Sequence, residues 1–200
     1  MLLERIKTDS HFASYHSKVA GQTIQKNIID TSCCENNICA EIDDSLSQDD
    51  YLIIKVDSYF QKSKSGNTPK GVDCLILVRG NPDKYCLYLI ELKNEDSSTL
   101  KDKIDDIIEK FQHTIDFLLK EKKFAKYFNR IFENVQFDLI SKVTIDSERN
   151  KRDDLLARQA YRNLLNKIYK LPLNPVKKTE FSVSINMKYR DTKKLIKPCK

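Results

Sequence analysis

Apolar positions along the chain follow two spacings, one typical of strands and the other of helices. Runs rich in Ile, Leu, Val and Tyr at 51–58, 72–79 and 85–93 predict three consecutive strands joined as a meander. Apolar residues three and four positions apart over 99–120 predict a long amphipathic helix, and a shorter helix is expected over 122–133. This order favours a mixed α/β arrangement of layers.

The outer segments complete the predicted fold. Helices are expected over 10–29, where Gly21 interrupts the apolar spacing, and over 152–169. A strand is predicted at 135–145, and because a long helix separates it from the preceding strand, the two can pair in parallel. The segment 181–189 is a candidate edge strand before a basic tail. Together these elements predict an α/β fold with a mixed central sheet flanked by helices.

The length of 200 residues suits a single domain. We expect its core over about 50–145, a helical N-terminal region over 1–50 and a basic C-terminal region over 147–200. Polar stretches at 31–50 and 61–70 predict loops. No apolar run approaches the roughly eighteen residues of a membrane span, and the first residues are charged, so we expect neither membrane insertion nor export but a cytoplasmic protein.

Six cysteines could form disulfides, but a chain without a secretory signal favours free thiols. Cys74 and Cys86 lie inside apolar runs, where reduced cysteine packs as a small hydrophobic residue. Cys33, Cys34 and Cys39 lack the paired CxxC spacing of a zinc site, so a loop with free thiols is favoured over a metal site.

Charge is distributed unevenly around the net value of +6. Residues 1–50 contain four Lys or Arg and nine Asp or Glu, whereas residues 147–200 contain fifteen and five. A polyanion such as nucleic acid is a natural partner for the basic C-terminal region, because each neutralised phosphate releases counterions. A lysine-rich exterior that only favours solubility explains the charge equally well.

The second and third predicted strands bring three charged residues together. Turn-forming residues separate these strands, and if Arg79 opposes Tyr85, then Asp73 lies opposite Glu91. Directly opposed residues project from the same face, and Lys93, two positions beyond Glu91, shares that face. The register therefore predicts an Asp, a Glu and a Lys at one end of a hairpin.

Two facing carboxylates in a partly apolar site repel each other, and a shared proton or a bound cation relieves the repulsion. Mg²⁺ fits best, because it takes oxygen ligands, which Asp73, Glu91 and the backbone carbonyl of Leu92 can supply. Lys93 would then orient a water molecule or stabilise negative charge on a phosphate. The alternative is a surface ion pair between Lys93 and one of the carboxylates.

These residues resemble the signature of the PD-(D/E)xK nuclease superfamily, which contains restriction endonucleases, Holliday-junction resolvases and RecB-type nucleases. The likeness rests on Gly71-Val72-Asp73 and on Ile90-Glu91-Leu92-Lys93, with Val72 in place of the usual proline. It covers about residues 50–120 and implies a restriction-endonuclease-like αβββαβ core. It also implies Asp73 and Glu91 as ligands of Mg²⁺ or Mn²⁺ and Lys93 as the catalytic lysine. The superfamily includes members that only bind.

The resemblance suggests supporting residues as well. Some members have a glutamine on the following helix, for which Gln112 is the candidate, although a polar residue beside a packed helix stripe explains it equally well. Many members add an acidic residue from an earlier region, and Glu41, Glu35 and Asp57 are candidates.

Two basic segments are candidates for nucleic-acid contact, with solvated surfaces as the alternative. Their residues are Lys62, Lys64 and Lys70 in one segment and Arg152, Arg158 and Arg162 in the other.

The sequence therefore predicts a metal-dependent nuclease that hydrolyses phosphodiester bonds of DNA, with a restriction-type endonuclease as the leading version. Cutting both strands needs two sites, so a homodimer or a partner subunit is expected. The alternatives are a junction resolvase or repair nuclease, and a catalytically inactive nucleic-acid-binding or protein-interaction module with the same fold.

Overall fold

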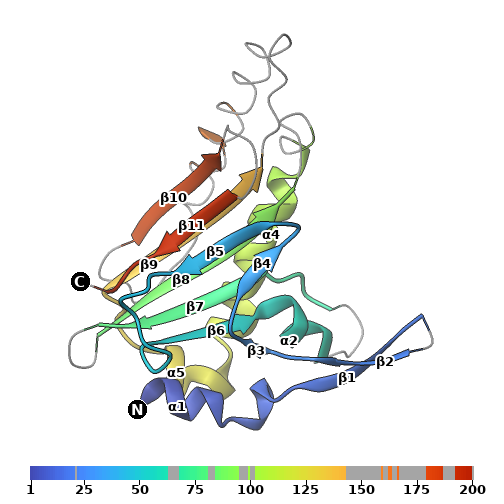
Figure 1. Cartoon of the computed structure of the whole chain (residues 1–200), viewed down its shortest axis with the longest axis vertical. Helices are drawn as coiled ribbons and strands as arrows, with labels where there is room; N and C mark the ends of the chain where they lie inside the picture. The colour runs from blue at the N-terminus through green and yellow to red at the C-terminus, as the bar shows by residue number, and fades with distance from the viewer. Residues whose placement is uncertain are drawn as a thin grey trace.

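A computed structural model describes most of the chain and gives a mixed α/β fold with mixed sheets (Figure 1). The described residues are 1–20, 22–62, 68–80, 84–94, 99, 102–142, 159, 162–163, 166, 179–186 and 192–199. No helix within these residues combines the length and the apolar character needed to cross a membrane.

The main sheet has six strands in the order β10-β9-β8-β7-β6-β3. They are β3 (Ile29–Asp30), β6 (Tyr51–Lys55), β7 (Cys74–Arg79), β8 (Tyr85–Lys93), β9 (Asn134–Lys142) and β10 (Thr179–Asn186). The meander β6-β7-β8 is antiparallel, and Arg79 opposes Tyr85 as the sequence predicts. The strands β8, β9 and β10 run parallel, which confirms the predicted crossover.

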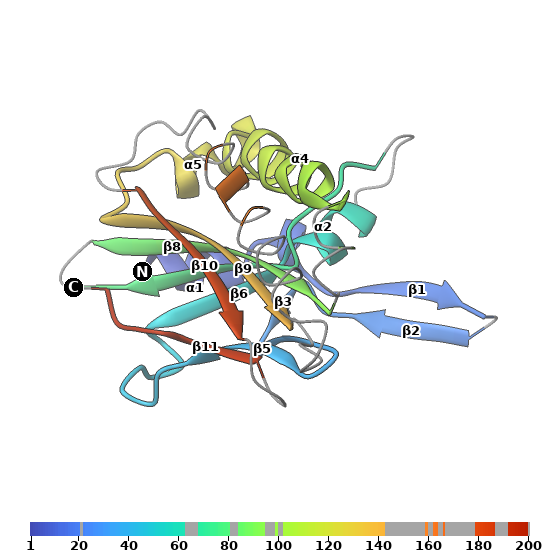
Figure 2. The same ribbon diagram turned by 90° about the horizontal axis from the view of Figure 1, so that it is seen from above.

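Both faces of the main sheet are buried, which explains why its central strands are almost continuously apolar. Alternate residues point to opposite faces, so Leu75 and Leu89 join one apolar cluster whereas Ile76 and Ile90 join another. Figure 2 shows α4, α5 and α2 on one side of the sheet and β5 and β11 on the other. The chain thus forms a three-layer arrangement.

Helices cover the first face of the main sheet. They are α1 (Leu2–Lys7), α2 (Val56–Lys62), α4 (Ile104–Thr114) and α5 (Ala125–Phe128), with 3₁₀ turns at Ser10–Phe12 and Lys122–Phe124. The predicted long helix is confirmed as α4, which continues as a turn of π-helix over Ile115–Leu119. The helix expected over 122–133 is shorter than predicted, because the chain leaves the helix after Phe128.

A three-stranded sheet with the order β11-β5-β4 covers the second face. Its strands are β4 (Cys33–Glu35), β5 (Ile38–Ile42) and β11 (Thr192–Ile196). The loop predicted over 31–50 is therefore partly wrong, and the basic tail contains a strand. Lys194 of β11 forms an ion pair with fully buried Asp138 of β9, whose pKa burial raises to about 6.

The structure pairs all six cysteines, so the expectation of free thiols is wrong. The disulfides are Cys33–Cys74, Cys34–Cys39 and Cys86–Cys199. Cys74 and Cys86 lie on the face of the main sheet that the small sheet covers. Their partners, Cys33 and Cys199, come from the small sheet and from the C-terminal segment. An apolar strand context predicts that a cysteine is buried, but it does not reveal whether a second cysteine reaches it.

The helix predicted over 10–29 is also wrong, since this segment contains β1 (Tyr15–Val19) and β2 (Gln22–Lys26). Ala20 has a φ of 49°, which suits a two-residue turn between antiparallel strands. The β-branched residues around that turn favour strands over a helix. We call β1 and β2, together with their turn, the ribbon.

Other boundaries differ more modestly. The strand predicted over 51–58 ends at Lys55, and α2 begins at the next residue. The strands predicted over 135–145 and 181–189 correspond to β9 and β10, and β10 is the edge strand expected. The helix predicted over 152–169 lies almost wholly outside the described residues.

Candidate functional site

The structure brings Asp73, Glu91 and Lys93 together on the helix-covered face of the main sheet. Cys74 pairs with Ile90, so Asp73, just before β7, falls opposite Glu91 near the end of β8. The carboxylate of Asp73 accepts a 2.6 Å hydrogen bond from the backbone N–H of Leu92 through Oδ2. The grouping predicted from the hairpin register is therefore confirmed.

Glu91 is fully buried between two ammonium groups. Its Oε1 lies 2.6 Å from Nζ of Lys93 and 2.8 Å from Nζ of Lys110. Within the described part of the chain, its other oxygen, Oε2, is buried without a hydrogen-bond partner. A buried carboxylate oxygen without a partner is costly, so this atom is suited to accept a ligand from outside the fold.

Burial and the negative charge of Asp73 raise the pKa of Glu91 to about 8, although Lys110 and Lys93 act in the opposite direction. Desolvation penalises the charged form, and a neighbouring carboxylate penalises it further. Glu91 therefore needs positive charge to remain ionised at neutral pH. A divalent cation would supply it, as the two lysines partly do here.

Lys110, on α4, belongs to this site although the sequence analysis missed it. Burial alone would lower its pKa, but the carboxylates of Glu91, Asp73 and Asp57 raise it above the usual range. It is therefore a stable ammonium group beside Glu91. A signal was available, since Lys110 lies three residues after buried Ile107 and four before buried Thr114, on the inward face of the helix.

Asp57 is the acidic candidate that lies nearest to this group. It occupies the first turn of α2, and its Oδ1 accepts a 3.1 Å hydrogen bond from the backbone N–H of Gly71. Burial raises its pKa, and the charge of Asp73 adds to the rise. Gly71 permits this close approach, because a Cβ there would lie 2.7 Å from a methyl carbon of Val56.

The other acidic candidates lie in the small sheet. Glu41 is on β5, opposite Leu195 of β11, so the structure does not place it on the helix-covered face with Asp73 and Glu91. Glu35 borders a cavity of about 150 Å³ at the end of β8. This cavity is lined by Glu35, Asn36, Ile38, Leu92, Lys93 and Asn94. Lys93 lines this cavity, and its side chain is 15% exposed.

Val72, which precedes Asp73, has a structural role that a proline could not fill. Its backbone N–H donates a 3.1 Å hydrogen bond to Oγ1 of buried Thr114, whose hydroxyl donates to the carbonyl of Lys110. Proline has no N–H to donate. This connection fastens the start of β7 to the turn of α4 that presents Lys110.

Several predicted contact residues have other roles in the structure. Gln112 donates a hydrogen bond to Asp116, four residues further along the chain, and its supporting role at the site stays a prediction. Lys70 pairs with Asp106 and Glu109 at 2.7 and 2.8 Å, and these carboxylates already neutralise it. Lys70 thus forms ion pairs with α4 in this structure, and its contact with nucleic acid stays a prediction.

The remaining basic candidates divide into three groups. Lys62 donates hydrogen bonds to backbone carbonyl groups of the segment before β1 and so has a structural role. Arg162 is exposed. Lys64, Arg152 and Arg158 lie outside the described residues.

Asp73 and Glu91 form a carboxylate pair that fits a hard divalent cation. No cluster of three or more His, Cys, Asp or Glu side chains suited to a metal occurs among the described residues. Mg²⁺ commonly uses only one or two carboxylates and completes its shell with water and substrate oxygens. Asp73 and Glu91, with the buried Oε2 of Glu91 that lacks a partner, meet that smaller requirement.

Replacement of Lys110 by Met is expected to destabilise the protein by about 3 kcal/mol at pH 9, because it removes one of two cations from a buried carboxylate. The loss should shrink as the pH falls, since protonation of Glu91, whose pKa is raised, removes the uncompensated charge. Urea unfolding at pH 9 and pH 6 measures both values.

Lys120→Met is the matched control for this experiment. Lys120 forms an exposed pair with Asp116, and its loss is expected to change stability by no more than about 0.5 kcal/mol at either pH. An equal destabilisation by Lys110→Met at both pH values would contradict the charge balance described for Glu91.

Comparison of the chain with protein-family models, with curated proteins and with solved structures found no match. The resemblance to PD-(D/E)xK nucleases therefore stays a prediction from the motif.

Proposed function

We propose that the chain is a metal-dependent nuclease that hydrolyses phosphodiester bonds of DNA, most simply as a restriction-type endonuclease. The observation that carries this proposal is the meeting of Asp73 and Glu91 with the ammonium groups of Lys93 and Lys110 at one end of the main sheet. The buried carboxylate of Glu91 faces the half-buried carboxylate of Asp73 across adjacent chain segments, and with lysines beside them this pair suits the binding of a cation and a phosphate.

The order of elements around the site supports the same class. Helix α1 precedes the meander β6-β7-β8, which is followed by α4 and then by β9 parallel to β8. This succession supports the proposed αβββαβ core, in which β1–β5 would precede the meander as an insertion, α2 would be an insertion within it, and α5 would be an addition after α4. The acidic pair lies at the hairpin position that the superfamily motif implies.

In the proposed reaction, Asp73, Glu91 and the backbone carbonyl of Leu92 would hold Mg²⁺ or Mn²⁺. The cation would polarise the scissile phosphate and favour deprotonation of the attacking water. Lys93 stabilises the negative charge that develops on the phosphate, from a position beside the cavity. Lys110 favours the ionised form of Glu91, so that this carboxylate can serve as a ligand.

The described residues contain one such acidic pair, and double-strand cleavage requires two reacting centres. We therefore propose that the nuclease acts as a homodimer or with a partner subunit when it cuts both strands. A nicking enzyme would need only one chain.

Incubation of the protein with supercoiled plasmid tests the proposal. The wild type is expected to cut the plasmid with Mg²⁺ and to stop when EDTA is added, and Lys93→Ala is expected to cut at least about a hundredfold more slowly. Lys122→Ala, which removes an exposed positive charge elsewhere, should cut as the wild type does.

The outcomes separate the alternatives. Equal nicking by the wild type and Lys93→Ala would remove Lys93 from the mechanism. Binding to nucleic acid without cleavage of plasmid, linear duplex or branched duplex would favour the inactive module. Preferential cleavage of branched duplex would instead favour a junction resolvase or repair nuclease.

A further inference from the structure

The ribbon is a projecting surface feature outside the site. The strands β1 and β2 pair with each other in a separate two-stranded sheet. Figures 1 and 2 show this sheet projecting away from the main body beside α2. At about 3.4 Å per residue, five-residue strands extend roughly 17 Å.

The register of the ribbon sorts its side chains into two different faces. His16 opposes Gln25, and Lys18 opposes Thr23, so these four residues share one face. All four are exposed, and all carry hydrogen-bonding or charged groups. The other face contains Tyr15, Ile24 and Lys26. One face of the ribbon is therefore wholly polar over these positions.

The ribbon is also locally basic within an acidic region. Residues 1–50 carry an excess of acidic residues, yet no Asp or Glu occurs between Asp9 and Asp30. Two of the four cationic residues of this region, Lys18 and Lys26, belong to the ribbon. Its charge thus favours a negatively charged partner.

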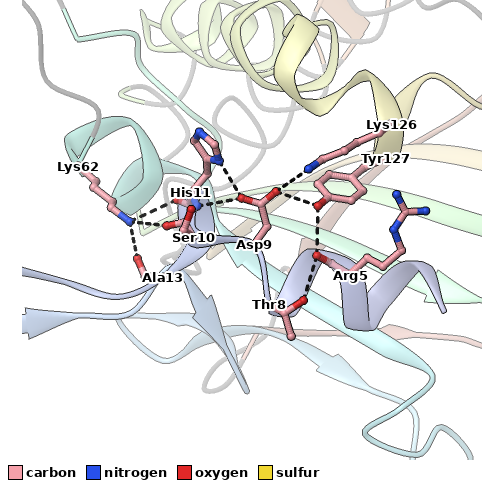
Figure 3. Close-up of polar contacts among 9 residues, drawn as sticks. All are labelled: Arg5, Thr8, Asp9, Ser10, His11, Ala13, Lys62, Lys126 and Tyr127. Carbon is pink, nitrogen blue, oxygen red and sulfur yellow. Dashed lines mark hydrogen bonds and ion pairs between the residues drawn. The ribbon is translucent and has the colours of Figure 1, made fainter.

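The base of the ribbon is fastened to the body, as Figure 3 shows. Nζ of Lys62 donates to the carbonyl oxygens of Ser10 and Ala13 at 3.1 and 2.8 Å, just before β1 begins. The carboxylate of Asp9 accepts from Lys126 and from the hydroxyl of Tyr127 at 3.0 and 2.8 Å. These contacts hold the chain that enters the ribbon.

One of these anchors connects the ribbon with the candidate site. Lys62 ends α2, and Asp57, in the first turn of the same helix, lies near Asp73 and Lys93, whose charges act on its carboxyl group. Tyr15, the first residue of β1, also donates a hydrogen bond to Gln61 of α2. The ribbon is thus held by the helix that supplies an acidic residue to the site.

We propose that the ribbon enters the major groove of duplex DNA and positions the duplex for the site, an inference that rests on the proposed nuclease function. The major groove of B-DNA, about 12 Å wide and 8.5 Å deep, admits a two-stranded ribbon. Lys18 meets a phosphate or a guanine, and Gln25 and Thr23 offer donors and acceptors to base edges. The major groove of duplex RNA is too narrow for such a ribbon.

Reversal of the charge of Lys18 tests the inference by binding alone. Fluorescence anisotropy in EDTA measures the affinity for a labelled DNA duplex and for an RNA duplex of the same sequence. Lys18→Glu is expected to weaken DNA binding about tenfold, and Lys18→Gln is expected to reduce the slope of log affinity against log salt by about one. Lys122→Glu and Lys122→Gln are the matched controls, and thermal unfolding checks that every variant is folded.

The results distinguish this inference from the nuclease proposal. Lys18 variants that bind the DNA duplex as the Lys122 variants do would overturn the ribbon assignment, even if the wild type cuts DNA. Equal weakening on the DNA and RNA duplexes would overturn the assignment to the major groove. Selective loss of DNA binding by Lys18→Glu, in a protein that cuts no substrate, would support the ribbon while the nuclease proposal failed.

Discussion

Replacement of Asp73 by Asn is expected to lower the rate of the proposed Mg²⁺-dependent DNA cleavage by about a thousandfold or more, because it would remove an anionic ligand of the proposed cation that is worth several kcal/mol. The side-chain oxygen of Asn can still accept the hydrogen bond that Leu92 donates to Asp73. The fold should therefore persist, and the lower rate should come from the reaction and not from unfolding. Cleavage of plasmid by equal amounts of folded protein measures the effect.

The charge balance of the site gives this variant a second signature. The carboxylate of Asp73 raises the pKa of Glu91, so its removal lets Glu91 ionise at lower pH. Asp73→Asn is thus expected to match or exceed the wild type in stability at pH 8, as judged by urea unfolding. Loss of cleavage together with gross destabilisation would indicate that Asp73 serves the fold and not the reaction.

The central part of the site was predictable from local rules. Turn residues and alternation fixed the pairing of Arg79 with Tyr85, and that pairing alone brought Asp73 opposite Glu91. A strand repeats every two residues, so the position of Lys93 on the same face followed directly. Short-range geometry was sufficient because all three residues belong to one hairpin.

Residues from other elements were harder to predict. Lys110 reaches Glu91 from α4, and Asp57 comes from a helix that the sequence pattern predicted as the end of a strand. Packing of a helix on a sheet depends on long-range contacts that periodicity does not specify. The few apolar residues of the ribbon also fit a helical spacing, so the sequence pattern predicts a helix there. The positive φ of Ala20 instead belongs to the turn that separates β1 from β2.

The C-terminal segment leads to the second large prediction. Replacement of Cys86 and Cys199 by Ala is expected to destabilise the protein by up to about 5 kcal/mol, because their disulfide closes a loop of more than one hundred residues. For a chain of this length, that loss lowers Tm by about 10–20 °C. The disulfide lies beside Gly80 and follows β11, so its loss also frees the strand that carries Lys194.

The Cys34–Cys39 pair provides the control, because its loop is short and its removal is expected to cost only about 2 kcal/mol.

Structural disulfides persist in oxidising compartments, so the three disulfides conflict with the cytoplasmic expectation. Thermal unfolding with and without a reductant resolves the conflict. The reductant should lower the Tm of the wild type to below that of the variant that lacks Cys86 and Cys199, since it also opens Cys33–Cys74. An unchanged Tm, with six titratable thiols in the unfolded protein, would instead show that the cysteines are reduced.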